Sequence, residues 1–249
     1  MIVRFGGVDS YYSHGYLIPF IVAFLIWRKR ERLKNMSPTG SKWGLAIIIL
    51  ALLLHLTGTV LYVFSLSGFS IYLLIIGATL FLFGKEIAKE LAFPLGYIIL
   101  MFPLPLAVMT AISFPLKLVA VKLGSSIVRM LGVPILREGF NISVPGGNLV
   151  VGNPCSGLRS ILSFFVVGML LAYLIPASFP RKAILILSII PVAILSNIIR
   201  VPLLILIAYH WGQPAASPES PLHTLTGVLA FLLGIGLLLA ISKILQWKS

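Results

Sequence analysis

The sequence predicts an all-α integral membrane protein, a polytopic bundle of about seven transmembrane helices with an interfacial amphipathic helix and a small external β-hairpin. Three observations support this fold class. Hydrophobic residues make up 59% of the 249-residue chain and charged residues only 10%, whereas a soluble domain carries about 25% charged residues. The apolar residues gather in runs that approach the roughly 20 residues a membrane span needs. Basic residues fill the short gaps between these runs.

The first half of the chain contains four predicted spans, at residues 11–27, 44–64, 69–83 and 92–111. The basic segment 28–42 directly follows the first span. Because short cytoplasmic loops collect Lys and Arg, we place this segment in the cytoplasm and the N-terminus outside. Residues 65–68 then form a tight external turn. Pro103 and Pro105 interrupt the fourth span, which a membrane helix tolerates where neighbours satisfy the freed carbonyls.

Residues 114–131 carry Lys117, Lys122 and Arg129 within an apolar pattern. This combination is typical of an amphipathic helix that lies in the membrane interface. We therefore predict an interfacial helix on the outer side. The alternative is an eighth span, which would invert the orientation of every later helix and move the later basic loops outside.

Residues 135–153 are the one stretch with strand character. Apolar and polar residues alternate from Phe140 to Val144, and Pro145, Gly146 and Gly147 then supply a turn. This pattern predicts a β-hairpin. Three further spans follow, at residues 156–175, 183–209 and 223–242. No repeat or linker divides the chain, so we predict one polytopic domain over residues 1–249.

The net charge of +13 raises the possibility of nucleic-acid binding. The positions of the basic residues argue against it, because they mark the cytoplasmic ends of spans rather than one continuous patch. Membrane lipids, and not nucleic acid, are the expected partners of these charges. The predicted location is the cell (inner) membrane, crossed several times.

Three residues are chemically reactive or costly at their predicted depth. Cys155, the only cysteine, lies at the outer mouth of a helix, where the helix dipole and free N–H groups favour a thiolate. Arg200 lies inside an apolar helix, where a charge costs about 2.5 kcal/mol or more. His223 opens the last span. All three are predicted at the same outer depth.

Each residue has a structural alternative. Cys155 alone would fit inert packing, Arg200 would fit a side chain that extends to the outer headgroups, and His223 would fit a solvated helix end. His14, which precedes the first span on the same side, is the nearest rival histidine. Arg159 supports the reactive interpretation of Cys155, because it follows one helical turn later on the same face.

Together, Cys155, His223 and Arg200 suit acyl transfer. A thiolate attacks a carbonyl and forms a thioester, a histidine moves the protons, and an arginine stabilises the oxyanion. One cysteine and scattered histidines give no metal-ligand spacing, so we expect neither a metal nor another cofactor.

Several motifs resemble the exosortase/archaeosortase family over nearly the whole chain. The segment from Asn153 to Ser160, which includes Cys155, Ser156, Gly157 and Arg159, is similar to the family's cysteine motif. Asn197 and Arg200 resemble its Asn-x-x-Arg motif, and His223 with Gly227 resembles its histidine motif. The flanking segments 12–15, 102–105 and 137–139 also match. Pro154 departs from the family pattern, in which many relatives have Ala before the cysteine.

The resemblance implies a membrane-embedded cysteine protease and transpeptidase. Such enzymes act on exported proteins whose C-terminal signal comprises a short motif, a transmembrane helix and a basic tail, and they transfer the cleaved protein to a lipid or envelope acceptor outside the membrane. By this likeness Cys155 is the nucleophile, His223 the general acid and base, and Arg200 the oxyanion partner. Arg159 and Asn197 have supporting roles.

Two other functions remain open from the sequence. A transporter would use the buried Arg200 in a pathway for an anionic solute, and its activity would not depend on Cys155. A noncatalytic scaffold for envelope assembly would tolerate substitution of all three residues.

Overall fold

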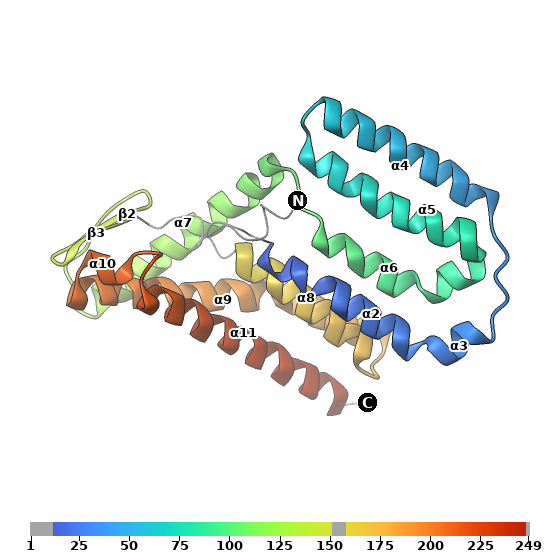
Figure 1. The fold of residues 1–249 in the computed structure, drawn as a ribbon. Helices are drawn as coiled ribbons and strands as arrows, with labels where there is room; N and C mark the ends of the chain where they lie inside the picture. The colour runs from blue at the N-terminus through green and yellow to red at the C-terminus, as the bar shows by residue number, and fades with distance from the viewer. Residues whose placement is uncertain (1–11, 151–157, 248–249) are drawn as a thin grey trace. The chain divides into compact units, whose positions relative to one another are not determined.

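The structure is a computed structural model of the chain, and it describes residues 12–150 and 158–247. The chain forms two compact units, Met1–Pro105 and Leu106–Ser249, and each is described by itself. Figure 1 shows that helices dominate both units and that one small sheet belongs to the second.

The first unit contains helices only among its described residues. In chain order they are η1 (Ser13–Tyr16), α2 (Ile18–Arg28), α3 (Arg30–Lys34), α4 (Lys42–Val60), α5 (Phe64–Glu90), α6 (Ala92–Ile98) and η2 (Ile99–Met101).

The second unit combines helices with the sheet. Its elements are α7 (Leu106–Met130), β1 (Leu136–Glu138), β2 (Asn141–Val144), β3 (Gly147–Val150), α8 (Leu158–Leu174), α9 (Phe179–Trp211), α10 (Gln213–Ala216) and α11 (Pro221–Trp247).

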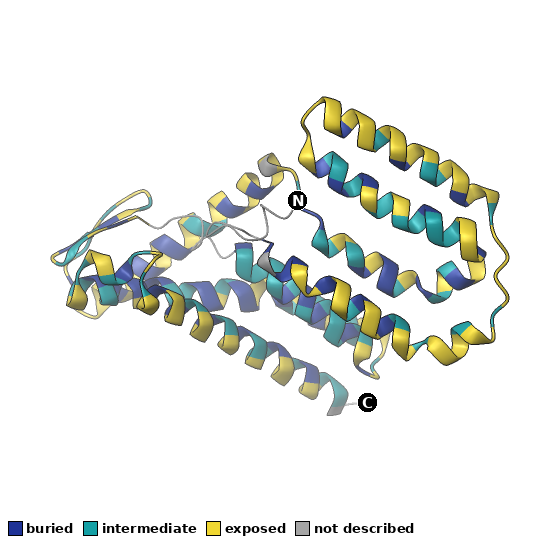
Figure 2. Ribbon diagram, viewed as in Figure 1, coloured by how far each residue is buried: buried dark blue, intermediate teal, exposed yellow. Residues whose placement is uncertain are grey.

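The predicted class, a polytopic helical membrane protein, is confirmed. Five stretches of the described chain are long and apolar enough to cross a membrane, and three shorter apolar helices accompany them. The five are Lys42–Val60, Phe64–Glu90, Ala107–Met130, Phe179–Trp211 and Gln213–Gln246. Apolar side chains cover the exposed surface of α4, which is coloured as exposed along most of its length in Figure 2. Lipid tails are the solvent that suits such a surface.

Helices α4 and α5 form a closely packed antiparallel pair. A Cβ on Gly44 would overlap the backbone of Phe81, and a Cβ on Gly77 would lie 3.0 Å from the side chain of Ile48. Small residues let membrane helices approach closely in this way. The turn between the two helices lies at residues 61–63, where Tyr62 has φ 54°. The predicted turn at 65–68 is wrong, since those residues begin α5.

The predicted boundary between a span at residues 92–111 and a separate helix at residues 114–131 is also wrong. The chain breaks at Phe102 to Pro105, where the two prolines interrupt the helical bonds, and α7 then continues as one helix through residue 130 with Pro115 inside it. The segment 114–131 is therefore not a separate interfacial helix. Lys117, whose charge suggested an interface, lies with its Nζ 4.1 Å from the ring centroid of Phe140.

Contacts in each unit bring basic helix ends together. In the first unit, Lys29 after α2 forms an ion pair of 2.8 Å with Glu90 at the end of α5. In the second, Arg181 near the start of α9 donates a hydrogen bond of 3.5 Å to the carbonyl of Leu245 near the end of α11. Each pair of ends therefore lies on one side of any membrane that its helices cross, as the positive-inside pattern predicts.

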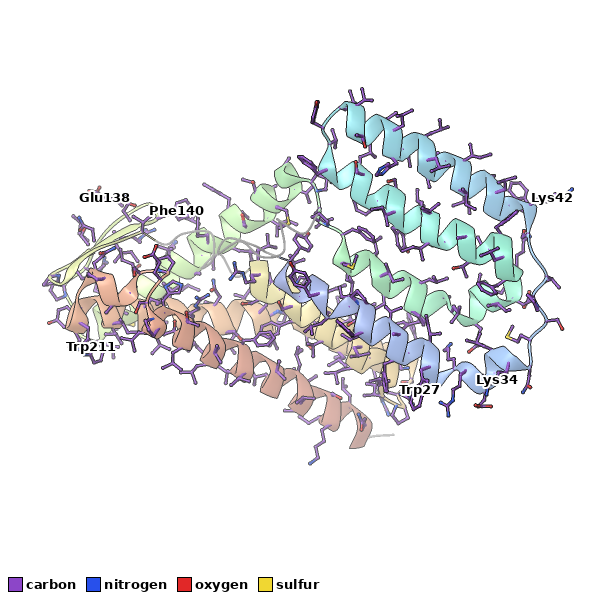
Figure 3. The ribbon with its side chains drawn as sticks, viewed as in Figure 1. Trp27, Lys34, Lys42, Glu138, Phe140 and Trp211 are labelled. Atoms are coloured by element: carbon purple, nitrogen blue, oxygen red, sulfur yellow. The ribbon has the colours of Figure 1, made fainter. Side chains whose placement is uncertain are left out.

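The predicted hairpin is confirmed, and β1 extends it to a three-stranded antiparallel sheet of order β1-β2-β3. Ile142, Val144 and Leu149 point to one face and are buried in a core cluster with α9 residues such as Ile205 and Ala208. The sheet therefore packs on the C-terminal part of α9. Figure 3 shows Glu138 and Phe140 of the sheet region at the same end of the unit as Trp211, the last residue of α9.

A second core cluster holds α8, α9 and α11 together. Phe164 of α8 is fully buried and stacks on Phe231 of α11 with ring centroids 5.3 Å apart. Leu185 and Ile189 of α9 complete this cluster with Leu238. These contacts orient the three helices that carry the predicted site residues.

Candidate active site

The cysteine motif lies at the junction between the sheet and α8. Cys155, Ser156 and Gly157 fall outside the described residues, between the end of β3 at Val150 and the start of the described part of α8 at Leu158. The predicted placement of Cys155 at a helix start is therefore not tested. The elements on both sides of it belong to the second unit.

Arg200 lies far along α9 from its basic end. It follows Arg181 by nineteen residues, which corresponds to about 28 Å of helix. His223 precedes Lys243 on α11 by twenty residues, or about 30 Å. The basic ends of α9 and α11 lie together. Arg200 and His223 therefore lie at a similar depth, separated from those ends by about the thickness of a hydrocarbon core.

Gly227 makes room for Arg200 against α11. A Cβ built on Gly227 would lie 3.2 Å from Nη2 and 3.4 Å from Cζ of Arg200, so the guanidinium lies directly against the helix at this point. Gly227 is four residues after His223, and residues with this spacing share a helix face. Arg200 and His223 are therefore on the same side of α11.

The buried ring of His223 has a defined orientation. The side chain is 7% exposed, and Nδ1 lies 3.0 Å from the carbonyl oxygen of Ala216 in α10. A carbonyl only accepts hydrogen bonds, so Nδ1 carries the proton and donates it. In the neutral ring Nε2 is then left with a lone pair, the form that a general base requires.

Arg159 and Arg200 both interact electrostatically with His223. Arg159 is the second described residue of α8, four positions after Cys155 in the sequence. The structure thus brings α8, α9 and α11 residues together at one end of the second unit. Of these residues, the sequence analysis predicted that Arg200 and His223 lie at one depth on separate helices.

Asn197 lies one turn before Arg200 and is 5% exposed. It forms part of the wall of an apolar pocket of about 130 Å³ between α7, α8 and α9. The other lining residues are Pro115, Leu116, Val119, Ala120, Ile161, Ala193 and Ile194.

The rival histidine, His14, belongs to the first unit. It is buried, and its ring centroid lies 5.6 Å from that of Tyr12. The Tyr12 hydroxyl accepts a hydrogen bond of 2.9 Å from the backbone N–H of Leu104, so two of the flanking motifs contact each other. The remaining histidines, His55 and His210, are exposed. Of the two histidines in the second unit, His223 is the buried one.

Sequence reasoning missed one element of the site, the carbonyl of Ala216 that orients His223. No sequence signal marks it, because any residue supplies a carbonyl and the contact depends on how α10 folds back on α11. The role of Gly227 was also not evident, although the histidine motif included it.

A family model described as Transmembrane exosortase (Exosortase_EpsH) matches residues 6–240, nearly the whole chain. No curated protein and no solved structure matches the chain.

Proposed function

From the membership of this chain in the transmembrane exosortase family, we propose that it is a membrane-embedded cysteine peptidase and transpeptidase that cleaves the C-terminal sorting signals of exported proteins. One observation of the structure supports this proposal most directly. His223, Arg200 and Arg159 lie near one another at one end of the second unit, and Arg159 follows Cys155 by four residues in the sequence.

In the proposed reaction, Nε2 of His223 first takes the thiol proton of Cys155, and the resulting thiolate attacks the carbonyl carbon of the scissile peptide bond. The negative charge that develops on the carbonyl oxygen receives hydrogen bonds from the Arg200 guanidinium. The C–N bond then breaks, and the leaving amine takes a proton from His223. A thioester joins Cys155 to the exported protein.

The second half-reaction releases the protein. Neutral His223 accepts a proton from the incoming nucleophile, which attacks the thioester carbonyl and displaces the Cys155 thiolate. The bond from Nδ1 to Ala216 supports this role, since it leaves Nε2 for both proton transfers. A lipid or envelope amine or hydroxyl acceptor gives transfer, and water gives hydrolysis.

We place this chemistry on the extracytoplasmic side. Basic residues collect at the cytoplasmic ends of spans, and Arg181 and Lys243 mark such ends on α9 and α11. The site then lies opposite the basic ends of α9 and α11, outside the cytoplasm.

A processing assay tests the proposal. The chain is co-expressed with an exported protein that carries a motif, a transmembrane helix and a basic tail, and cleavage is followed by the change in its mass. We expect Cys155→Ala and His223→Ala to abolish processing and the exposed-histidine control His210→Ala to retain it.

Unchanged processing in Cys155→Ala would show that the nucleophile assignment is wrong. The transporter alternative predicts a different pattern, in which uptake of an anionic solute depends on Arg200 but not on Cys155. A scaffold would function with each substitution.

A further inference from the structure

The strand that leads to the cysteine motif lies at an edge of the sheet. The strand order is β1-β2-β3, so β3 pairs on one side only. Among the described residues no further strand lies beside it. An edge strand offers main-chain N–H and C=O groups to a strand from another chain.

The register identifies which groups face the open edge. Val144 and Gly147 flank the two-residue turn and pair with each other, so they exchange both hydrogen bonds. Bonded and non-bonded pairs alternate along an antiparallel ladder. The pairs Ser143–Asn148 and Asn141–Val150 are consequently non-bonded, and Asn148 and Val150 direct their N–H and C=O groups away from β2.

The same groups are accessible within the described structure. No hydrogen bond from residues 12–150 or 158–247 reaches the outward main-chain groups of Asn148 or Val150. The Val150 side chain is 66% exposed, whereas the neighbouring Leu149 is 7% exposed and points into the core. The inner face therefore anchors β3 while its edge and outer face remain open.

The few residues between β3 and Cys155 limit how far the predicted nucleophile can be from this edge. Cys155 follows Val150 by five residues, and five residues span at most about 18 Å when fully extended. A segment bound along the edge is thus within a few residues' length of the thiol.

We propose that the open edge of β3 binds the substrate's recognition segment as an additional strand. This inference rests on the proposed function and adds the mode of substrate binding. A peptide bond is open to attack when its chain is extended, because the carbonyls of a helix are enclosed by their own hydrogen bonds and side chains. Main-chain bonds supply affinity in such strand addition, and side-chain contacts supply specificity. The two outward-facing residues suit a short recognition motif.

Disulfide crosslinking tests the pairing without requiring activity. Cys155→Ala removes the only cysteine, and Asn148→Cys then places one thiol on β3. A co-expressed substrate protein carries single cysteines at successive positions before its transmembrane helix. Side chains of a strand alternate between faces, so we expect crosslinks at every second substrate position.

A matched control is Asn141→Cys in the same Cys155→Ala background. Asn141 is exposed on the same outer face but lies on the central strand, about 10 Å from an added strand. A disulfide needs Cβ atoms about 4 Å apart, so this variant should give no crosslink. Absence of crosslinks from Asn148→Cys, or crosslinks without alternation, would overturn the proposal.

A proline variant of the active chain provides a second test. Val150→Pro removes one outward N–H, and an edge strand tolerates proline at such a position. We expect processing to fall at least about fivefold, the value of one hydrogen bond of about 1 kcal/mol. Arg137→Pro changes an outward N–H on the opposite edge, β1, and should leave processing unchanged.

The two proposals fail in distinguishable ways. If Cys155→Ala abolishes processing while Val150→Pro has no effect and no alternating crosslinks form, only the strand-addition proposal is wrong. If Cys155→Ala retains processing, the proposed chemistry is wrong, and the crosslinking result still decides whether β3 binds the segment.

Discussion

Two single-atom-scale features define the geometry of the candidate site. Gly227 has no Cβ, and the Arg200 guanidinium occupies the space that a Cβ would restrict. The Ala216 carbonyl holds Nδ1 of His223. A half-buried arginine and a buried histidine are each costly in a membrane, and these contacts orient them toward one location.

Enlarging Gly227 should therefore impair the reaction through Arg200. We expect Gly227→Val to lower the processing rate at least about tenfold, because its methyl groups displace the guanidinium, and loss of such a donor costs about 10²-fold or more. The matched control is Gly236→Val on the same helix, since no atom outside its local helix backbone lies within 4 Å of a Cβ built there. Equal rates in the two variants would argue against an oriented Arg200.

The two ring nitrogens of His223 should be separable by substitution. The amide of His223→Asn reaches the position of Nδ1, whereas that of His223→Gln reaches the position of Nε2. We expect both variants to lose processing by about 10²-fold or more.

Only the Gln variant should also lose the bond to Ala216, worth about 1 kcal/mol, and unfold about 2–4 °C lower. Thermal unfolding in detergent measures this difference. An active Asn variant would contradict the acid–base assignment.

At the scale of elements, the sheet is positioned by a close approach to α9. A Cβ on Gly146 would overlap the backbone carbonyl of Ala208, and the N–H of Gln213 donates to the Gly146 carbonyl at 3.1 Å. The turn of the hairpin is thus seated on the end of α9 and the start of α10. Because β3 leads directly to the cysteine motif, this contact links the motif to the helix that carries Arg200.

A side chain at Gly146 should lift the sheet from α9. We expect Gly146→Asn to destabilise the chain by about 1–3 kcal/mol, as overpacking typically does, and to reduce processing. Gly139→Asn is the matched control, because its φ of +60° suits Asn and nothing lies within 4 Å of its Cβ position. Similar unfolding temperatures for the two variants would show that the Gly146 contact is unimportant.

At the scale of the whole molecule, charge determines how the helices are expected to cross the membrane. Basic residues gather at the ends of α2, α5, α9 and α11, and two contacts hold these ends together in pairs, Lys29 with Glu90 and Arg181 with Leu245. The candidate site lies at the opposite ends of α9 and α11. This arrangement predicts cytoplasmic basic ends and an extracytoplasmic site.

Single-cysteine labelling checks this orientation. In a Cys155→Ala background, Glu219→Cys before α11 should react with a membrane-impermeant maleimide in intact cells. Lys243→Cys at the other end of α11 should react only after permeabilisation. Both native residues are exposed, so access to the reagent depends on the side of the membrane. The reverse pattern would mean that α7 adds a crossing and the site faces the cytoplasm.

The sequence by itself determined the membrane class, the approximate spans and the hairpin. Long apolar runs indicate helices surrounded by lipid, and the alternation before Pro145 and Gly146 indicates a strand followed by a turn. Both patterns lie within a short stretch of the chain, so the sequence alone shows them. The sequence also supplied the order of Cys155, Arg200 and His223. All three lie within residues 6–240, the range that the family model matches.

Only the tertiary structure decided where α7 begins and how the site residues meet. Four features depend on how the elements contact each other. They are the break at Phe102 to Pro105, the added strand β1, the space beside Gly227 that the Arg200 guanidinium fills, and the carbonyl partner of His223. Such contacts join residues distant in sequence, and the shape of a neighbouring side chain or a backbone carbonyl leaves no periodic pattern along the chain.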